Sequence, residues 1–107
     1  MTRKTGPYRD LLMERLDDPD VAGHYLNAAM DNSPQAFLKA LKDVAQARQM
    51  SKVAKDAGVQ RETLYRSLSE QGNPTFGTLS SVLRVLGFKM YIVPEGHSES
   101  SVASLSK

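Results

Sequence analysis

Residues 51–69 read SKVAKDAGVQRETLYRSLS, in which a glycine separates two short stretches with apolar residues at helical spacing. Gly58 suits the position just after a helix, because the left-handed conformation needed there carries no Cβ penalty. A small Ala54 lets the two helices cross closely, and Val59 is expected to insert beneath the turn. The residues expected to pack inward are Val53, Leu64 and Leu68. Two short helices joined in this way are typical of a helix-turn-helix unit.

The second helix of this unit has a separate polar face, which we expect to point away from the core. Arginine can bind guanine with two hydrogen bonds, glutamine can read adenine, and glutamate can accept a hydrogen bond from cytosine. These residue types suit the base edges of a DNA major groove and are found at Gln60, Arg61, Glu62, Tyr65 and Arg66. The alternative is a surface helix whose charges are merely solvated, with Glu62 and Arg66 as an i, i+4 ion pair.

Amphipathic helices with short connections are predicted on both sides of this unit, which gives six helices in all. The expected helices cover residues 8–16, 19–30, 34–47, 52–57, 61–69 and 76–86. Their expected capping residues are Asp18, Ser33, Ser51 and Thr75, with prolines at two of the first helical positions. The tripeptide Gly72-Asn73-Pro74 predicts a turn before the last helix.

Residues 88–93, FKMYIV, are rich in β-branched and aromatic side chains and predict one short strand that ends at Pro94. The predicted fold class is therefore all-α with one short C-terminal β-strand. The expected organisation is a flexible N-terminus (1–7), one domain (8–94) and a Ser-rich tail (95–107), in which a short helix is the alternative to a flexible chain. Within the domain we expect N-terminal helices (8–48), the helix-turn-helix (51–69), a closing helix (75–86) and the strand (88–93).

The composition excludes several classes of protein. The chain has 107 residues, of which 40% are hydrophobic and 24% charged, as expected for one folded domain. Because it has no cysteine, a disulfide framework, a thiolate zinc site, an iron–sulfur cluster and a cysteine nucleophile are excluded. No apolar run approaches the ~20 residues that span a bilayer, and no signal peptide is evident, so we expect a cytoplasmic protein without a membrane partner.

The net charge of +2 is unevenly distributed along the chain. Residues 1–50 hold seven basic and seven acidic residues, residues 51–90 hold six and three, and residues 91–107 hold one and two. The basic excess therefore coincides with the helix-turn-helix unit and points weakly to a polyanionic partner. The small total favours a protein that binds DNA through dimerisation and a few placed contacts rather than through bulk charge.

No enzyme pattern is present in the sequence. The two histidines, His24 and His97, are not paired with a carboxylate or serine in a recognisable nucleophile, metal or acid–base arrangement. The aspartates of residues 17–20 resemble helix caps rather than a calcium loop, since the glycine and distal glutamate of that loop are missing. We therefore expect a protein that is not an enzyme and has no cofactor and no metal site.

The run from Ala54 to Ser69, followed by Gly72-Asn73-Pro74-Thr75-Phe76 and Leu79, resembles the Cro/C1-type (XRE) helix-turn-helix of the probable addiction-module antidote family. The most specific parts are residues 62–66, ETLYR, and the Gly-Asn-Pro turn, and the likeness covers roughly residues 8–93. One departure is Gln60, where such proteins usually place a serine as N-cap. Either the second helix starts one residue differently, or Gln60 itself contacts DNA.

This resemblance implies a lambda-repressor-like helix-turn-helix bundle and the function of an antitoxin encoded beside a small RNase toxin. Such proteins bind the promoter of their own module as dimers, repress it, and neutralise the toxin by direct contact. Base reading carries over to Gln60, Arg61, Glu62, Tyr65 and Arg66. Phosphate contacts carry over to Ser51, Lys52, Lys55, Asn73 and Thr75. The implied partners are thus operator DNA, expected to be palindromic, a second copy of the chain, and a small RNase toxin.

Two other functions are compatible with the same residues. One is a free-standing repressor of the phage type without a toxin, and the other is a protein-interaction module that keeps the helix-turn-helix shape without specific DNA binding. The exposed polar face of residues 61–66 favours DNA, because a pure interaction module need not keep it.

A lone strand leaves its backbone groups unpaired, so the predicted strand needs a partner. Pairing with a second copy would use Phe88, Met90, Tyr91, Ile92 and Val93 and would set two recognition helices about one DNA turn, ~34 Å, apart. The alternative is that this segment packs along its own helices or pairs with the N-terminal segment.

Overall fold

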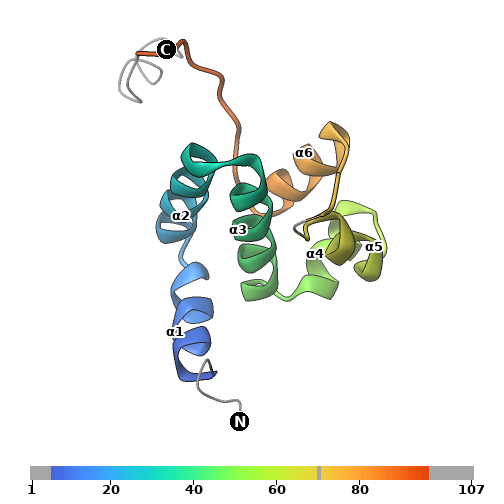
Figure 1. Ribbon diagram of the computed structural model, residues 1–107. Coiled ribbons are helices and arrows are strands. Elements are labelled where there is room, and N and C mark those ends of the chain that lie inside the picture. Colours follow the sequence, from blue (N-terminus) through green and yellow to red (C-terminus); the bar gives the residue numbers. More distant parts are fainter. Residues whose placement is uncertain (1–5, 70, 97–107) are drawn as a thin grey trace.

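The computed structural model describes residues 6–69 and 71–96, which form six α-helices joined by short connections (Figure 1). The helices are α1 (Gly6–Leu16), α2 (Pro19–Asn32), α3 (Pro34–Ala47), α4 (Met50–Ala57), α5 (Arg61–Ser67) and α6 (Phe76–Val85). The prediction of an all-α protein is confirmed for this part of the chain. Residues 1–5 of the expected N-terminal segment and residues 97–107 of the expected tail lie outside the described residues.

Three helices begin at the capping residues that the sequence predicts. The side-chain oxygens of Asp18, Ser33 and Thr75 each accept a backbone N–H from the first turn of the helix, at 2.9, 3.0 and 3.1 Å. Pro19 and Pro34 then occupy the first helical positions of α2 and α3, where a missing N–H costs nothing. Ser33 alone connects α2 to α3, so these two helices fold back on each other with almost no loop.

The predicted cap of α4 is wrong by two residues. Ser51 lies inside the first turn, and the N-cap position is taken by Gln49, which has a φ of 71° and makes no side-chain capping bond. Met50, the first residue of the helix, is buried in the core. Gln49 therefore carries the sharp change of direction between α3 and α4 in a conformation that side chains rarely adopt.

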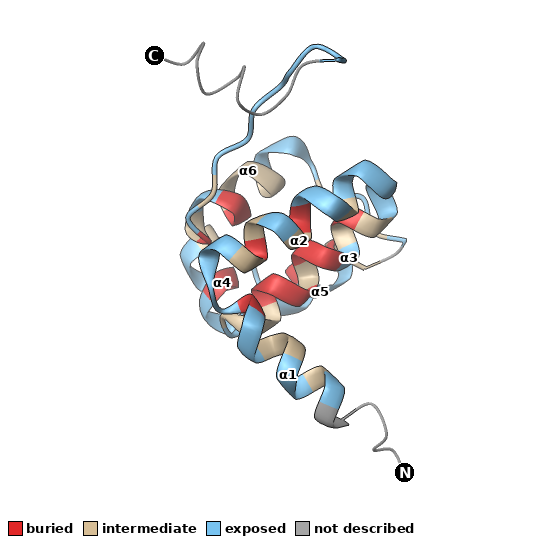
Figure 2. Ribbon diagram, turned by 90° about the vertical axis from the view of Figure 1, so that its left-hand side faces the viewer, coloured by how far each residue is buried: buried red, intermediate tan, exposed pale blue. Residues whose placement is uncertain are grey.

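The core consists of two helix groups that meet at α3 and α4. α3 packs against α1, α2 and α4, whereas α4 packs against α5 and α6. The fully buried side chains include Leu16, Leu41 and Val44 in the first group and Leu64, Leu68 and Val82 in the second. Figure 2 shows the buried residues on the inner faces of α2 to α6, while α1 projects beyond the other helices.

The predicted C-terminal strand is absent: residues 88–93 form no strand, and the described chain contains none at all. The segment leaves α6 after Gly87, and only its first residue, Phe88, packs against the core, beside Gly23 of α2. From Met90 to Val93 the side chains are exposed, and Ile92 is 98% accessible. Local propensity favoured a strand, but a strand exists only when a neighbour supplies its hydrogen bonds, and the described chain offers none.

Candidate nucleic-acid interface

α4 and α5 are joined by a tight turn at Gly58, which has the left-handed φ of 78° that the sequence predicts. The N–H of Gly58 donates to the carbonyl of Lys55, and that of Val59 donates to the carbonyl of Ala54. Ala54 itself is buried, as expected for a small side chain between α4 and α5. This turn fixes the direction of α5 relative to α4.

The inner face of α5 is anchored by Leu64 and by Leu68 at its C-terminal end, both with no accessible surface. Val59 is partly buried beside them, as expected for a residue beneath the turn. Because these apolar contacts fix the rotation of α5 about its axis, the opposite face of the helix is presented to solvent.

All five predicted base-contacting residues lie on that exposed face or at its start. The set consists of Gln60, Arg61, Glu62, Tyr65 and Arg66, and each is exposed. Gln60 occupies the N-cap position with extended backbone angles and makes no side-chain capping bond. The helix therefore starts at Arg61, and the amide of Gln60 is not used to close it.

The ion pairs among the described residues do not include Glu62 with Arg66. They join Arg9 to Asp43 and Arg48 to Asp17, both remote from α5. The polar face of α5 is therefore not neutralised by this i, i+4 pair.

The predicted phosphate-contacting residues flank α5 on two sides. Ser51, Lys52 and Lys55 are exposed on α4, and Asn73 and Thr75 are exposed in the connection to α6. α4 contacts both α5 and α6, so these residues come from elements that pack together. Thr75 caps α6, with its side-chain oxygen accepting the N–H of Thr78.

The connection after α5 depends on a close backbone approach at Gly72. The N–H of Gly72 donates to the carbonyl of Ser69 at 2.7 Å. A Cβ added at Gly72 would overlap the carbonyl of Ser67, so no larger residue fits without a shift of the backbone. This glycine therefore sets the path of the chain from α5 to the cap of α6.

Sequence reasoning missed two basic residues next to this interface. The ammonium nitrogen of Lys42, on α3, lies 4.5 Å from the centroid of the Tyr65 ring, a cation–π contact. Lys39 and Lys42 also line a groove of about 360 Å³ together with Leu68, Ser69 and Gln71. Their i, i+3 spacing on the polar side of α3 is a signal in the sequence, although the acidic residues of 1–50 balance their charge.

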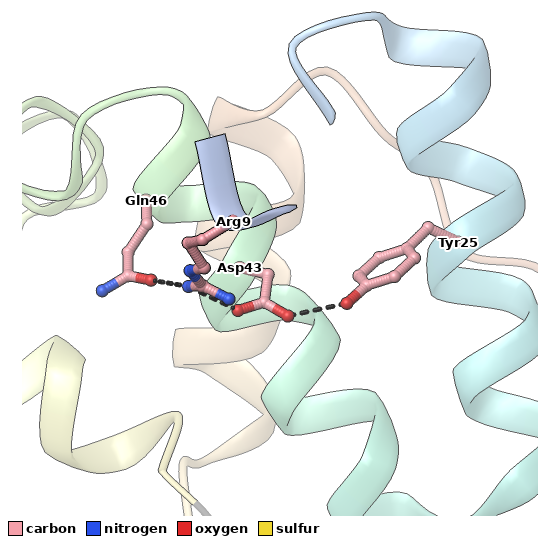
Figure 3. A network of polar contacts seen from close by, with 4 residues as sticks. All are labelled: Arg9, Tyr25, Asp43 and Gln46. Carbon is pink, nitrogen blue, oxygen red and sulfur yellow. Dashed lines mark hydrogen bonds and ion pairs between the residues drawn. The ribbon is translucent and has the colours of Figure 1, made fainter. Parts of the chain in front are cut away.

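A buried carboxylate was also missed (Figure 3). Asp43 on α3 is 2% exposed and accepts hydrogen bonds from the Arg9 guanidinium at 2.9 Å and from the Tyr25 hydroxyl at 2.7 Å. Arg9 also donates to the side-chain oxygen of Gln46 at 2.6 Å. Burial and the bond to Asp43 raise the pKa of Tyr25 above its usual range, so the hydroxyl stays a donor. This network joins α1, α2 and α3 and is structural.

A second groove, of about 630 Å³, lies between α2 and the segment that follows α6. Phe37 and Leu83 line it from the core, Met30 lines it from α2, and Met90 and Tyr91 line it from the segment. Met30, Met90 and Tyr91 are also exposed, so apolar surface continues from the groove to the outside. His24, at its rim, is an exposed helix residue.

Charge is separated between the helix pair α1–α2 and the helices α3–α6. Residues 6–32, which contain α1 and α2, hold six acidic and two basic residues, whereas residues 33–85, from α3 to α6, hold eight basic and four acidic ones. α1 and α2 lie on one side of α3, and α4 to α6 lie on the other (Figure 1). Residues 1–50, which have no net charge as a whole, thus contain the acidic pair α1–α2 followed by the basic helix α3.

Metal-ligating side chains do not gather at any one place in the described chain. No group of three or more of them occurs among residues 6–69 and 71–96. Within the same residues, no helix is both long and apolar enough to cross a bilayer.

The chain is similar to proteins that are already known. A family model described as "Probable addiction module antidote protein" matches residues 10–94. An uncharacterized protein of Haemophilus influenzae is 41% identical over 91 residues, which cover 76% of this chain and 94% of that protein. No solved structure matches the chain at a significant level. The family match spans α2 to α6 entirely and most of α1, so it includes both helix groups.

Proposed function

Because the chain belongs to the probable addiction module antidote family, we propose that it is the antitoxin of a toxin–antitoxin module and that it binds operator DNA through α5. The observation that carries the DNA-binding part is the exposed surface of α5, on which Glu62 and Arg66 stand opposite the buried Leu64 and Arg61 and Tyr65 are also exposed. A helix held by its apolar side, with guanidinium, carboxylate and phenol groups outward, has the chemistry needed to read a major groove.

In this proposal Gln60, Arg61, Glu62, Tyr65 and Arg66 contact bases, and the flanking residues contact phosphates. Lys52 and Lys55 supply charge from α4, while Ser51, Asn73 and Thr75 supply hydroxyl and amide groups. Phosphate contacts set the register of the protein on the duplex, and base contacts give the sequence preference. Binding to its own promoter would make the protein a repressor of its module.

A homodimer is part of the proposal, because two half-sites give the specificity that one small helix cannot. The surface that supports self-association is the apolar one formed by Met90, Tyr91, Ile92 and Val93 beside Phe88. Ile92→Asp tests it, since a side chain 98% exposed contributes nothing to the monomer core. Light scattering should show a dimer for the parent chain and an 11.8 kDa monomer for the variant; equal masses would remove the segment from the interface.

Neutralisation of a toxin needs a second surface, because α5 is used for DNA. The acidic pair of α1 and α2 is suited to a basic protein, and Tyr8 and Leu11 add exposed apolar area on α1. We assign the toxin contact to this end, with a small basic RNase as the partner. Co-purification with the product of the neighbouring gene tests it, and the double variant Asp10→Lys/Glu14→Lys should abolish the complex without affecting DNA binding.

The decisive experiment is selection of bound duplexes from a random pool, followed by sequencing. The proposal expects an enriched palindrome with half-sites about one helical turn apart, and affinity that falls steeply with rising salt. A phage-type repressor would give the same enrichment but no complex with a neighbouring gene product. An interaction module would retain no duplex even at low salt, which would refute the DNA-binding proposal.

A further inference from the structure

We propose that Lys39 and Lys42 of α3 form an additional binding site for a phosphate of the DNA backbone, beside the base-reading face of α5. This inference rests on the proposed DNA binding and extends its footprint to a helix outside the α4–α5 unit. The ligand class is a phosphodiester, and the site lies in the groove lined by the two lysines, Leu68, Ser69 and Gln71.

Lys42 lies close to the exposed face of α5. Lys42 places its ammonium group 4.5 Å from the centroid of the Tyr65 ring, so a side chain of α3 reaches the exposed face of α5. Tyr65 is itself 44% exposed, which means that the contact lies at the surface and not in the core. A duplex that meets Tyr65 therefore passes within reach of Lys42.

The two lysines give the groove a positive charge. Lys39 is exposed and shares the groove with Lys42, and the described lining contains no carboxylate. Neither lysine forms an ion pair with another described residue, and Asp43, the acid on the same helix, pairs with Arg9. Two ammonium groups that line one groove repel each other, and an anion between them removes that repulsion.

Ser69 and Gln71 line the same groove as the lysines. Ser69 donates its hydroxyl hydrogen to the carbonyl of Tyr65 at 2.9 Å, which fixes the side chain at the end of α5. Gln71 is exposed and carries an amide N–H₂ group that can donate to a phosphate oxygen. The groove is thus lined by two cationic donors from α3 and by a neutral donor, Gln71, from the connection after α5, together with the apolar Leu68.

Lys42 also has a positioning role in this proposal. Because the ammonium group of Lys42 lies over its ring, Tyr65 has less rotamer freedom on the exposed face of α5. The two lysines should therefore differ: Lys39 contributes to affinity alone, whereas Lys42 contributes to affinity and to the preference at the base pair that Tyr65 reads.

The test is fluorescence anisotropy with two labelled duplexes, one selected from the random pool and one scrambled, titrated over a range of salt concentrations. Lys39→Gln should lower the slope of log K against log salt by about 0.9 on both duplexes, because the protein then neutralises one phosphate fewer. Lys42→Gln should lower the slope equally and also reduce the ratio of specific to scrambled affinity. Lys42→Arg, which keeps the charge and the ring contact, should restore both.

Arg15→Gln is the matched control, because it removes an exposed cation from α1, on the other side of α3. Arg15→Gln should keep the salt slope of the parent protein. If both lysine variants also keep this slope while the parent still binds the selected duplex, the α3 site is wrong and the proposed function stands. If the parent binds neither duplex at low salt, the proposed function and this site fail together. Thermal melting of each variant excludes unfolding as the cause.

Discussion

The helix pair α1–α2 and the helices α3–α6 are built on the same principle, an apolar stripe buried against neighbours, yet they differ in what they show to solvent. The first pair is acidic and exposes Tyr8 and Leu11, whereas the second group is basic and exposes the polar face of α5. They also differ in how they are held. α5 is fixed by apolar anchors, while α1 is fixed to α3 in part by the buried Asp43 network. This difference in charge is why we propose two ligand classes, DNA and a basic protein, for one small chain.

The largest expected effect comes from breaking the attachment of α1. Arg9→Met leaves the buried Asp43 carboxylate with the Tyr25 hydroxyl as its remaining partner in this network, and should lower the free energy of unfolding by about 3 kcal/mol. Urea denaturation gives the total, and hydrogen exchange should locate the destabilisation in α1 and α2 rather than in α5. The double variant Arg9→Met/Asp43→Leu should recover most of the stability, because no buried charge is then left without its partner. Equal stability of the single variant and the parent would contradict a structural role for the network.

A second change acts on the other helix group. Gly72→Ala forces a Cβ against the carbonyl of Ser67 and should cost about 1–3 kcal/mol, with the destabilisation in α5 and α6. Gly77→Ala is the control, because its Cβ would lie 3.7 Å from the Thr75 hydroxyl, an ordinary contact, and alanine favours the helix. Chemical denaturation of the two variants should therefore show opposite signs. Two equal values would show that the turn can relax.

A third change leaves the fold intact and separates the functions of the two groups. Arg66→Ala, on the exposed face of α5, should weaken specific DNA binding by about 1–3 kcal/mol and relax the preference at one base pair. The proposed binding of a toxin at the acidic end should not change. The measurement is anisotropy on the selected and scrambled duplexes. An equal decrease in affinity for both would reassign Arg66 to the phosphates.

The smallest expected effect is that of Tyr25→Phe, which removes one hydrogen bond to Asp43 and should cost about 1 kcal/mol at neutral pH. Since the folded state raises the pKa of Tyr25, the stability that this tyrosine contributes is fully present below its unfolded pKa and falls as the pH rises above it. The difference between the two proteins should therefore be constant near neutrality and shrink in strongly alkaline solution. A difference that grows with pH would contradict the assignment of the hydroxyl as donor.

Local sequence signals predicted the features that depend on neighbouring residues. Asp18, Ser33 and Thr75 cap helices, and Gly58 turns the chain, because each acts within a few residues of its own position. The features that sequence reasoning missed depend on distant partners. Asp43 meets Arg9 across 34 positions, and Lys42 meets Tyr65 only once α3 and α5 are folded. The predicted strand of residues 88–93 was wrong for the same reason, since its existence depends on another strand.

The DNA-contacting roles of the α5 residues remain predictions, whereas the exposure of these residues has a structural basis. It follows from the burial of Leu64 and Leu68, which the helical spacing already indicated. Gln49 shows the limit of such reasoning, because no local signal predicts a non-glycine residue with a φ of 71° at the start of α4. Capping preferences alone pointed to Ser51.

The separation of charge across α3 has a kinetic consequence. A molecule with an acidic end and a basic end carries a permanent electric dipole, and the field of a duplex exerts a torque on it before the surfaces touch. In the proposed complex, the basic end would turn toward the DNA and the acidic end away, which would shorten the rotational search for a productive encounter. The acidic end would then face the solvent, where the proposed basic partner could reach it without displacing the duplex.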